Sequence, residues 1–215
     1  MTISCKGEEL ILSKERAVYW ASKKMLIISD LHLGKSATFR QAGIPVPSTV
    51  SDTDLNQLSA LIAGFLPEVL LVTGDMFHHQ MNTDVDTFCL WRMKYPSLKI
   101  ILIKGNHDKI RQEDYACMDI EIYPKEFLCW PFRFIHDLPE AQDEYYNISG
   151  HIHPGITIYG KSRQRLRLPC FYFGKKGAIL PAFSRFTGLS KVKTEEGDQF
   201  YAITPSTVVA VPIAD

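Results

Sequence analysis

The sequence predicts an α/β fold in which two β-sheets pack face to face, with helices on the outside. Up to about residue 118, short apolar runs alternate with helical patterns, which is typical of right-handed βαβ units and a mostly parallel sheet. Beyond that point strand-like runs dominate without strong helices between them, which predicts a second, largely antiparallel sheet. A chain of 215 residues has the length of one domain, so we expect a single domain over residues 1–215.

The first half of the chain supplies the elements of the parallel sheet. Residues 1–20 are expected to form an opening hairpin, and the apolar run Met25–Ser29 is typical of a buried strand. The longest predicted helix has one apolar face, and Ser51 with Asp54 resembles a capping box at its start. The other elements are helices over Lys35–Gln41, Ser51–Phe65 and near Asp84–Tyr95, and strands over Val69–Thr73 and Ile100–Ile103.

The second half is predicted as a series of short strands that build the second sheet. These strands are Ile120–Tyr123, Phe127–Trp130, Phe132–Ile135, Tyr145–Ile148, Ile156–Tyr159, Leu166–Phe173, Phe200–Ile203 and Val208–Val211.

Composition excludes several classes of protein. Hydrophobic residues make up 46% and charged residues 22%, as in ordinary globular proteins rather than disordered ones. No apolar run approaches the ~20 residues of a membrane span, and the polar N-terminus argues against a secretory signal. We therefore expect no membrane partner. The five cysteines form no Cys-x-x-Cys motif and are expected to be free thiols in a reducing cytoplasm.

Histidines follow the predicted strands in an unusual way. All seven lie just after an apolar run and beside an Asp, Asn or Gly; they are His32, His78, His79, His107, His136, His151 and His153. A lone histidine is more often a surface or core residue, but seven scattered at random would not all fall at strand ends. Ligands bind at the carboxyl ends of the strands in an open α/β sheet. We therefore expect Asp30, His32, Asp75, Asn106 and His107 to converge at one edge.

Donors of these types predict a metal site. His, Asp and Asn together suit Mn²⁺, Fe²⁺, Zn²⁺ or Co²⁺. No cysteine lies in the cluster, which argues against a structural zinc site. Asp75 carries two carboxylate oxygens and could bridge a pair of metals. Two ions roughly 3.5–4 Å apart can clamp a phosphate and generate hydroxide at neutral pH.

The ordered motifs resemble those of the calcineurin-like metallophosphoesterase superfamily. They are Asp30-x-His32, Gly74-Asp75, Gly105-Asn106-His107-Asp108, a lone His136 and Gly150-His151-x-His153. The resemblance implies a two-sheet αββα sandwich that binds two divalent metals. It implies one metal on Asp30, His32 and His153, and another on Asp75, Asn106, His136 and His151, with Asp75 shared. It also implies that His107, held by Asp108, protonates the leaving oxygen.

Further segments resemble one bacterial subfamily, the ligase-associated DNA damage response endonucleases of the PdeM type. They span 30–35, 39–40, 43–47, 74–78, 150–155, 168–171, 180–183 and 186–188. The resemblance implies Mn²⁺-dependent hydrolysis of phosphodiesters, with DNA as the expected substrate. It also implies an association with a DNA ligase, a helicase and an exonuclease-like protein. The segment 76–80 lacks the Asp-Arg-Gly of protein Ser/Thr phosphatases, which argues against that activity.

Candidate substrate contacts lie in these motifs and in a basic segment over residues 161–193. That segment holds nine Lys or Arg residues and no acid. Lys161, Arg163, Arg165 and Arg167 alternate, so an extended chain would point them to one side, where they could track a nucleic-acid backbone or protect an edge strand. The interleaved aromatics, Phe171, Tyr172, Phe173, Phe183 and Phe186, either stack on bases or pack in the core. The candidate substrate-binding residues are Lys35, Arg40, His78, His79, Arg163 and Arg165, although both histidines could equally lie behind the ligands or on the surface.

Three functions stay open at this point. The first is a di-metal phosphodiesterase or DNA endonuclease in repair. The second is a cyclic nucleotide or nucleotide-pyrophosphate phosphodiesterase with the same metals. The third is a non-catalytic scaffold on the same fold, which the complete ligand set disfavours. The sequence does not fix the oligomeric state.

Overall fold

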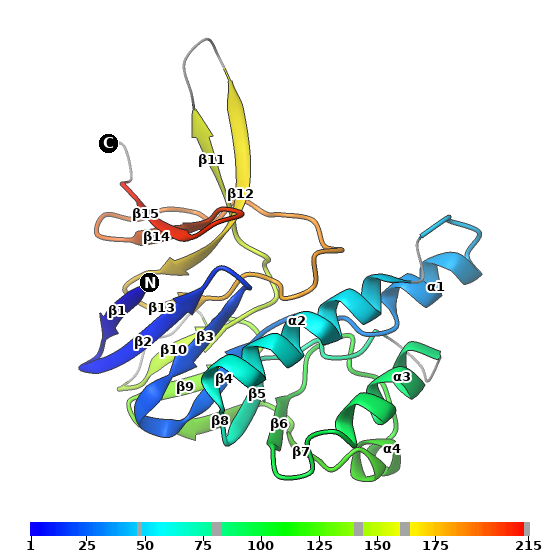
Figure 1. Ribbon diagram of the computed structural model, residues 1–215. Coiled ribbons are helices and arrows are strands. Elements are labelled where there is room, and N and C mark those ends of the chain that lie inside the picture. The colour runs from blue at the N-terminus through cyan, green and yellow to red at the C-terminus, as the bar shows by residue number, and fades with distance from the viewer. Residues whose placement is uncertain (47–48, 79–82, 140–143, 160–163, 213–215) are drawn as a thin grey trace.

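Two β-sheets stack face to face, and helices cover the outer face of one of them (Figure 1). The computed structural model describes the chain except for residues 47–48, 79–82, 140–143, 160–163 and 213–215. The first sheet has the strand order β1-β2-β3-β4-β5-β6-β7. Its strands are β1 Thr2–Cys5, β2 Glu8–Ser13, β3 Ala17–Trp20, β4 Met25–Ile28, β5 Val69–Val72, β6 Lys99–Ile103 and β7 Ile120–Tyr123.

Strands β4 to β7 run parallel, whereas β1 to β4 form an antiparallel meander. The helices lie in the connections between the parallel strands. They are α1 Lys35–Gln41, α2 Thr49–Phe65, α3 Thr83–Arg92 and α4 Gln112–Cys117; a short 3₁₀ turn, η1 Ala21–Lys23, precedes β4. Among the residues that the structure describes, no helix is long and apolar enough to cross a membrane.

The second sheet is mixed, in the order β15-β14-β12-β13-β10-β9-β8, with β11 paired to the outer part of β12. Its strands are β8 Glu126–Cys129, β9 Phe132–Ile135, β10 Tyr146–Ser149, β11 Gly155–Tyr159, β12 Arg165–Phe173, β13 Gly177–Ile179, β14 Gln199–Ile203 and β15 Val208–Val211. Strand β10 pairs in parallel with both β9 and β13, and the other pairs are antiparallel.

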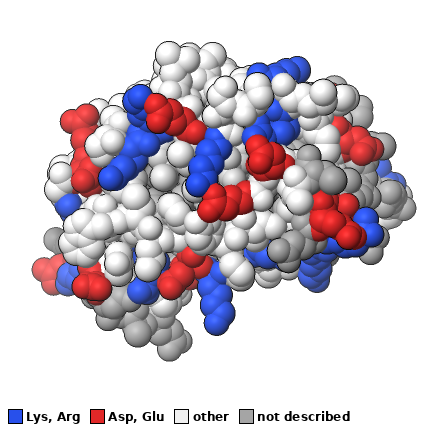
Figure 2. Space-filling model, turned by 90° about the horizontal axis from the view of Figure 1, so that it is seen from below, with Lys and Arg blue, Asp and Glu red and all other residues white. Residues whose placement is uncertain are grey.

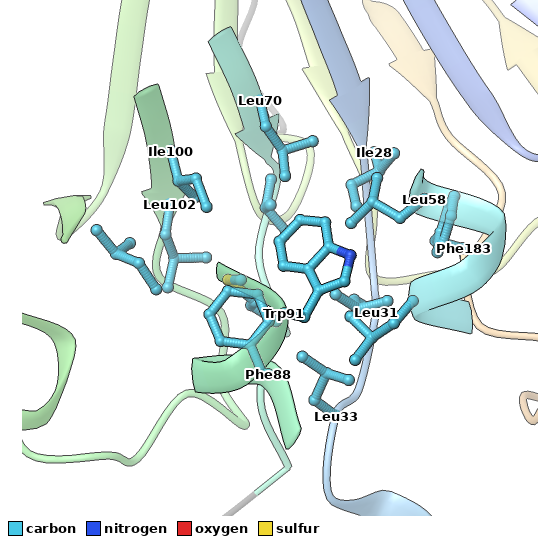
Figure 3. Close-up of a cluster of buried hydrophobic side chains, with 14 of the residues drawn as sticks. Ile28, Leu31, Leu33, Leu58, Leu70, Phe88, Trp91, Ile100, Leu102 and Phe183 are labelled. Carbon is cyan, nitrogen blue, oxygen red and sulfur yellow. The ribbon is translucent and has the colours of Figure 1, made fainter. Parts of the chain in front are cut away.

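Alternating side chains of the central strands fill two separate cores. On β4, Leu26 and Ile28 face the helices, whereas Met25 and Ile27 face the second sheet. Figure 3 shows the helix-side core, in which Trp91 and Phe88 of α3 pack against these strands. Both faces of the parallel strands are therefore buried, which explains why they appear in the sequence as unbroken apolar runs.

The predicted two-sheet α/β sandwich is confirmed, with several differences in detail. Ile120–Tyr123 joins the first sheet as β7 instead of opening the second. The middle of the second sheet is parallel, and the short strand β13 and helix α4 were not predicted. No described residue beyond Cys117 is helical, so the outer face of the second sheet lacks a helical layer in the described chain. Val192 packs there instead, in a small third apolar cluster.

The start of α2 also differs from the prediction. The helix begins at Thr49, so Ser51 lies inside it and not at its start. The carboxylate of Asp54 accepts hydrogen bonds from Ser184 and from the backbone of Arg185, far along the chain. A tertiary contact thus replaces the predicted local cap.

Candidate metal centre

The chain leaves five parallel strands at one edge of the sandwich, and a polar site lies there. Asp30 and His32 follow β4, while Asp75 follows β5. Further donors come from β6 and from the second sheet: Asn106 follows β6, His136 follows β9, and His151 and His153 follow β10. The carboxyl ends of both sets of parallel strands therefore supply the site, as expected for an open α/β sheet.

The backbone at these residues adopts an unusual conformation. Among the described residues, ten non-glycine residues have positive φ, and five of them are predicted ligands: Asp30, His32, Asp75, His151 and His153. Left-handed backbone is uncommon for such residues and is often found at functional sites. Two backbone hydrogen bonds hold the first loop against the second: Asp30 N–H donates to the carbonyl of Gly74 (3.1 Å) and His32 N–H to that of Asp75 (2.9 Å).

The first group consists of Asp30, His32 and His153. The Nε2 atoms of the two histidines lie 3.5 Å apart, and His153 Nε2 lies 3.4 Å from Asp30 Oδ1. The other carboxylate oxygen of Asp30 accepts hydrogen bonds from the Ser29 hydroxyl and from the backbone N–H of His151 (3.0 Å). Asp30 is fully buried and His32 nearly so. The buried carboxylate is thus fixed, with Oδ1 directed toward the histidine rings.

The second group consists of Asp75, His136 and His151, with Asn106 beside them. His136 Nε2 lies 2.9 Å from Asn106 Oδ1, 3.0 Å from His151 Nδ1 and 3.6 Å from Asp75 Oδ2. The other ring nitrogen of His136 lies 3.2 Å from the carbonyl of Thr73. Asp75 Oδ1 accepts the backbone N–H of His107 at 2.9 Å, which leaves Oδ2 toward the ring.

The donor atoms in each group fit a divalent cation. Asn106 Oδ1, His151 Nδ1 and Asp75 Oδ2 converge on His136 Nε2, which carries at most one proton. One cation could bind all of these lone-pair donors at once when the rings are neutral and the carboxylate is ionised. In each group one carboxylate oxygen and two imidazole nitrogens lie within 4.8 Å of one another. Such N and O donors suit Mn²⁺, Fe²⁺, Co²⁺ and Zn²⁺.

Electrostatics favour the protonation states that bind metal. Burial lowers the pKa of His32 to about 3, although the negative charge of Asp30 opposes this shift. Burial alone would raise the pKa of Asp30, but hydrogen bonds from His153 and Ser29 bring it below its ordinary value. At neutral pH the first group therefore offers an ionised carboxylate and a neutral His32 ring, the forms that coordinate cations.

His107 and His78 lie together beside the first group. Their rings stack with centroids 4.8 Å apart, and the ring of His32 meets each of them edge-on, at 5.5 Å and 5.9 Å. The predicted proton donor and the predicted phosphate contact thus both lie next to a ligand of the first group.

Asp108 connects two loops of the site. Its Oδ1 accepts the backbone N–H of Phe77 (2.9 Å) and its Oδ2 that of Gly105 (2.8 Å), whereas its predicted role of holding the ring of His107 stays a prediction. Burial raises the pKa of Asp108 to about 6, although both hydrogen bonds oppose the shift. These hydrogen bonds connect the loop that carries Asn106 and His107 to the loop after β5.

The predicted substrate-binding residues divide into those near the metal edge, those away from it and those outside the described residues. Lys35 lies near the metal edge, within electrostatic range of both Asp30 and Asp75. Arg40 instead points across to α3, where its Nη2 lies 3.6 Å from Asp84 Oδ1. His79 and Arg163 lie outside the described residues.

Arg165 lies on the β11–β12 hairpin, which projects from the sandwich (Figure 1), with its guanidinium over the ring of Tyr159. Tyr159 is six residues beyond His153 along an extended segment, which corresponds to roughly 20 Å. Arg165 is therefore distant from both metal groups, and any contact would be to a remote part of a long substrate. Of the interleaved aromatics, Phe171, Phe173 and Phe183 are buried in the cores, whereas Phe186 is half-exposed.

The sequence analysis missed the segment over residues 184–190 that borders the first group. Ser184 N–H donates to the carbonyl of Asp30 (3.3 Å), and Ser190 N–H to that of His153 (2.9 Å). The segment thus spans the first group from one ligand to another. No periodic pattern marks it; its sequence signals are its place in the basic segment and the resemblance of residues 186–188 to one subfamily, and neither indicates a contact with the ligands.

The comparison with family models decides the family. The model described as calcineurin-like phosphoesterase matches residues 23–186. The chain belongs to the calcineurin-like phosphoesterase family. It is a metal-dependent hydrolase, and the resemblance seen in the motifs is confirmed. The match covers every predicted metal ligand and the first residues, 184–186, of the segment that borders the first group.

A solved nuclease structure is similar to this chain over nearly its whole length. The crystal structure of the Pseudomonas putida nuclease MPE is similar over 98% of this chain and 99% of its own, with 28% identity and a TM-score of 0.82. Yfce, a phosphoesterase from E. coli, matches over 86% of this chain and 96% of its own, but its 13% identity and TM-score of 0.47 are too low to support an argument. Among curated protein sequences there is no match.

Proposed function

We propose that this phosphoesterase is a dinuclear-metal phosphodiesterase that cleaves DNA. The observation that carries the proposal is the direct link between the two donor groups, because Asp30 of the first accepts the backbone N–H of His151 of the second. Two cations held side by side in this way suit a phosphodiester. The similarity to a nuclease over nearly the whole chain supports a nucleic-acid substrate.

Each donor group would hold one ion. Asp30, His32 and His153 would bind the first, and Asp75, Asn106, His136 and His151 the second, with Asp75 shared between them. Two bound cations supply Lewis-acid polarisation of the phosphoryl group and an activated water at neutral pH. We propose Mn²⁺ as the natural metal, with Fe²⁺, Zn²⁺ and Co²⁺ as the ions to compare.

The remaining polar residues of the site act on the phosphodiester. His107 would donate the proton to the leaving oxygen, since its ring lies beside the first group. His78, stacked on His107, would contact a phosphoryl oxygen. Asp108 contributes by fixing the loop that carries His107.

A polymeric substrate fits the exposure of the site better than a small nucleotide does. The side chains of Asn106 and His151 are exposed at the rim, whereas Asp30 and His32 lie deep. Figure 2 shows Lys and Arg interspersed with Asp and Glu on one face of the molecule, so that face offers no extended basic surface. We therefore place DNA at the metal edge. Cyclic nucleotides and nucleotide pyrophosphates are the alternative substrates, and a scaffold without activity is the other alternative.

The proposal also covers the domain organisation, compartment and partner proteins of this phosphodiesterase. We propose that residues 1–215 act as one domain, in the cytoplasm, in DNA repair beside a DNA ligase, a helicase and an exonuclease-like protein. The free state of the four described cysteines, Cys5, Cys89, Cys129 and Cys170, supports a reducing compartment.

The proposal is tested by measuring hydrolysis of bis-p-nitrophenyl phosphate with added Mn²⁺, and cleavage of single-stranded and plasmid DNA against turnover of cyclic AMP. We expect hydrolysis of the ester and of DNA, both lost in Asp75→Ala. Absence of turnover above that variant would overturn the enzyme proposal. Turnover of cyclic AMP without DNA cleavage would instead favour a nucleotide phosphodiesterase.

A further inference from the structure

A cavity of about 310 Å³ opens beside the first metal group and has no part in the chemistry described so far. Its walls come from helix α1 and from the segment that borders the first group; they are Lys35, Phe39, Arg185, Phe186, Thr187 and Gly188. We call it the rim pocket.

Backbone contacts fix the rim pocket against all three residues of the first group. Lys35 N–H donates to the carbonyl of His32 (3.1 Å), on the α1 side. On the opposite side, the bordering segment begins at the carbonyl of Asp30 and ends at that of His153. A substrate whose scissile phosphate lies on the metals would therefore extend its next residue toward this pocket.

The side chains of the rim pocket combine positive charge with aromatic surface. The Lys35 ammonium is half-buried and, among the described residues, has no hydrogen-bond or ion-pair partner. Arg185 also lines the pocket, with its guanidinium paired to Glu15. The rings of Phe39 and Phe186 meet edge to face, with centroids 5.6 Å apart. Cations of this kind bind phosphate, and aromatic rings contact sugars and bases.

The bordering segment is held rigidly before any substrate binds. Arg16 Nη1 donates to the carbonyl of Ser184 (2.8 Å), and the buried Asp54 accepts hydrogen bonds from Ser184 and from the Arg185 backbone. The Arg185 side chain itself donates to Gln57 (3.2 Å) and Glu15 (3.1 Å). A pocket prepared in this way loses little conformational entropy on binding.

We propose that the rim pocket binds the nucleotide adjacent to the scissile phosphodiester. Lys35 contacts the phosphate of that nucleotide, and Phe39 and Phe186 contact its sugar and base. This inference rests on the proposed function and names the part of the substrate that the enzyme recognises beyond the reacting phosphate. Bis-p-nitrophenyl phosphate has no such nucleotide, so it cannot use the pocket in this way.

The test compares Phe186→Ala and Lys35→Gln with Leu166→Ala, which truncates an exposed apolar residue on the β11–β12 hairpin. Fluorescence anisotropy measures binding of fluorescein-labelled hexathymidylate with Ca²⁺ in place of Mn²⁺. We expect Phe186→Ala to weaken binding about tenfold, as for loss of one stacking contact. The ratio of kcat/KM for hexathymidylate to that for bis-p-nitrophenyl phosphate should fall by a similar factor. Leu166→Ala should change neither quantity.

Lys35→Gln gives an independent readout that a purely structural residue would not change. Removing one phosphate contact lowers the slope of log Kd against log salt concentration by about 0.7 for a single strand. Unchanged affinity, ratio and salt slope in both variants, while the wild type still cleaves DNA, would overturn the inference and leave the proposed function intact. Failure of the wild type to cleave or bind DNA would refute the proposed function and the inference together. Thermal unfolding identifies a misfolded variant, and the other variant then decides.

Discussion

Asp30 Oδ2 accepts a hydrogen bond from the backbone N–H of His151 at 3.0 Å, so the carboxylate of one donor group positions a ligand of the other. The two residues are 121 positions apart in the chain and come from different sheets. The two candidate metal positions are therefore structurally coupled.

This coupling predicts that Asp30→Asn affects both metals. The variant loses the charge that binds the first ion and weakens the contact that places His151. Affinity for the second ion should fall about tenfold, as expected when a residue that orients a ligand is changed. His32→Ala, the control, removes a ligand of the first group only. Isothermal titration with Mn²⁺ distinguishes them, and equal second-site affinity in both variants would show that the groups are independent.

Gly74 is predicted to be irreplaceable because of its neighbour. Its φ is +93°, and a Cβ there would overlap the ring of His136. Gly74→Ala should lower the free energy of unfolding by about 2 kcal/mol or more and weaken metal binding. Gly7→Ala is a matched control, because Gly7 has a φ of +81° with nothing within 4 Å of its Cβ position. Urea unfolding measures the free energy of unfolding of both variants. Equal losses of stability in the two would show that the overlap with His136 is relieved without cost.

Stability should depend on pH through Asp54. Burial raises the pKa of Asp54 to about 6 from 3.8, although hydrogen bonds from Ser184 and the Arg185 backbone oppose the shift. The folded protein therefore holds this proton more tightly than the unfolded chain, and this contribution to the free energy of unfolding falls as pH rises from about 4 to about 6.

Asp54→Asn removes that dependence. The unfolding free energy of the wild type minus that of the variant should decline by on the order of 1–3 kcal/mol across the window. The exposed Asp52→Asn on the same helix serves as the control. Urea unfolding at several pH values makes the comparison, and a difference that is constant with pH would mean that Asp54 titrates normally.

Asp108→Asn is expected to lower the stability of the fold and the affinity for metal. An amide can accept one of the two backbone N–H groups that the carboxylate now accepts, from Phe77 and Gly105, but its NH₂ would face the other. We expect a loss of about 1–3 kcal/mol in unfolding free energy and weaker binding of the ion that Asn106 would hold. Unchanged stability and metal affinity with slower turnover would contradict this expectation and would instead support the predicted role of Asp108 in holding the ring of His107.

The sequence predicts those parts of the fold that have a strong local pattern. Strands β4, β5 and β6 are buried on both faces, so they appear as apolar runs, and the residues that follow them are therefore recognisable. The grouping of Asp30, His32, Asp75 and Asn106 at one edge follows from parallel strands ending together. In contrast, the sequence does not predict the sheet to which Ile120–Tyr123 belongs, because a short strand carries no information about the strand it pairs with.

Contacts between distant segments could not be predicted in the same way. The hydrogen bonds of Asp108 depend on how the chain turns after β6, and those of Asp54 on a segment about 130 residues away. The rim pocket also depends on distant segments, because its walls come from residues 35–39 and 185–188. Although parts of the pocket walls lie in segments that resemble one subfamily, no periodicity or spacing shows that these positions meet, so only the folded chain reveals the contacts.

The most direct test of the central claim is anomalous scattering from crystals soaked with Mn²⁺. We predict two peaks roughly 3.5–4 Å apart, one within bonding distance of Asp30, His32 and His153, the other of Asp75, His136 and His151. A single peak, or peaks away from these residues, would contradict the dinuclear site and the phosphodiesterase mechanism built on it.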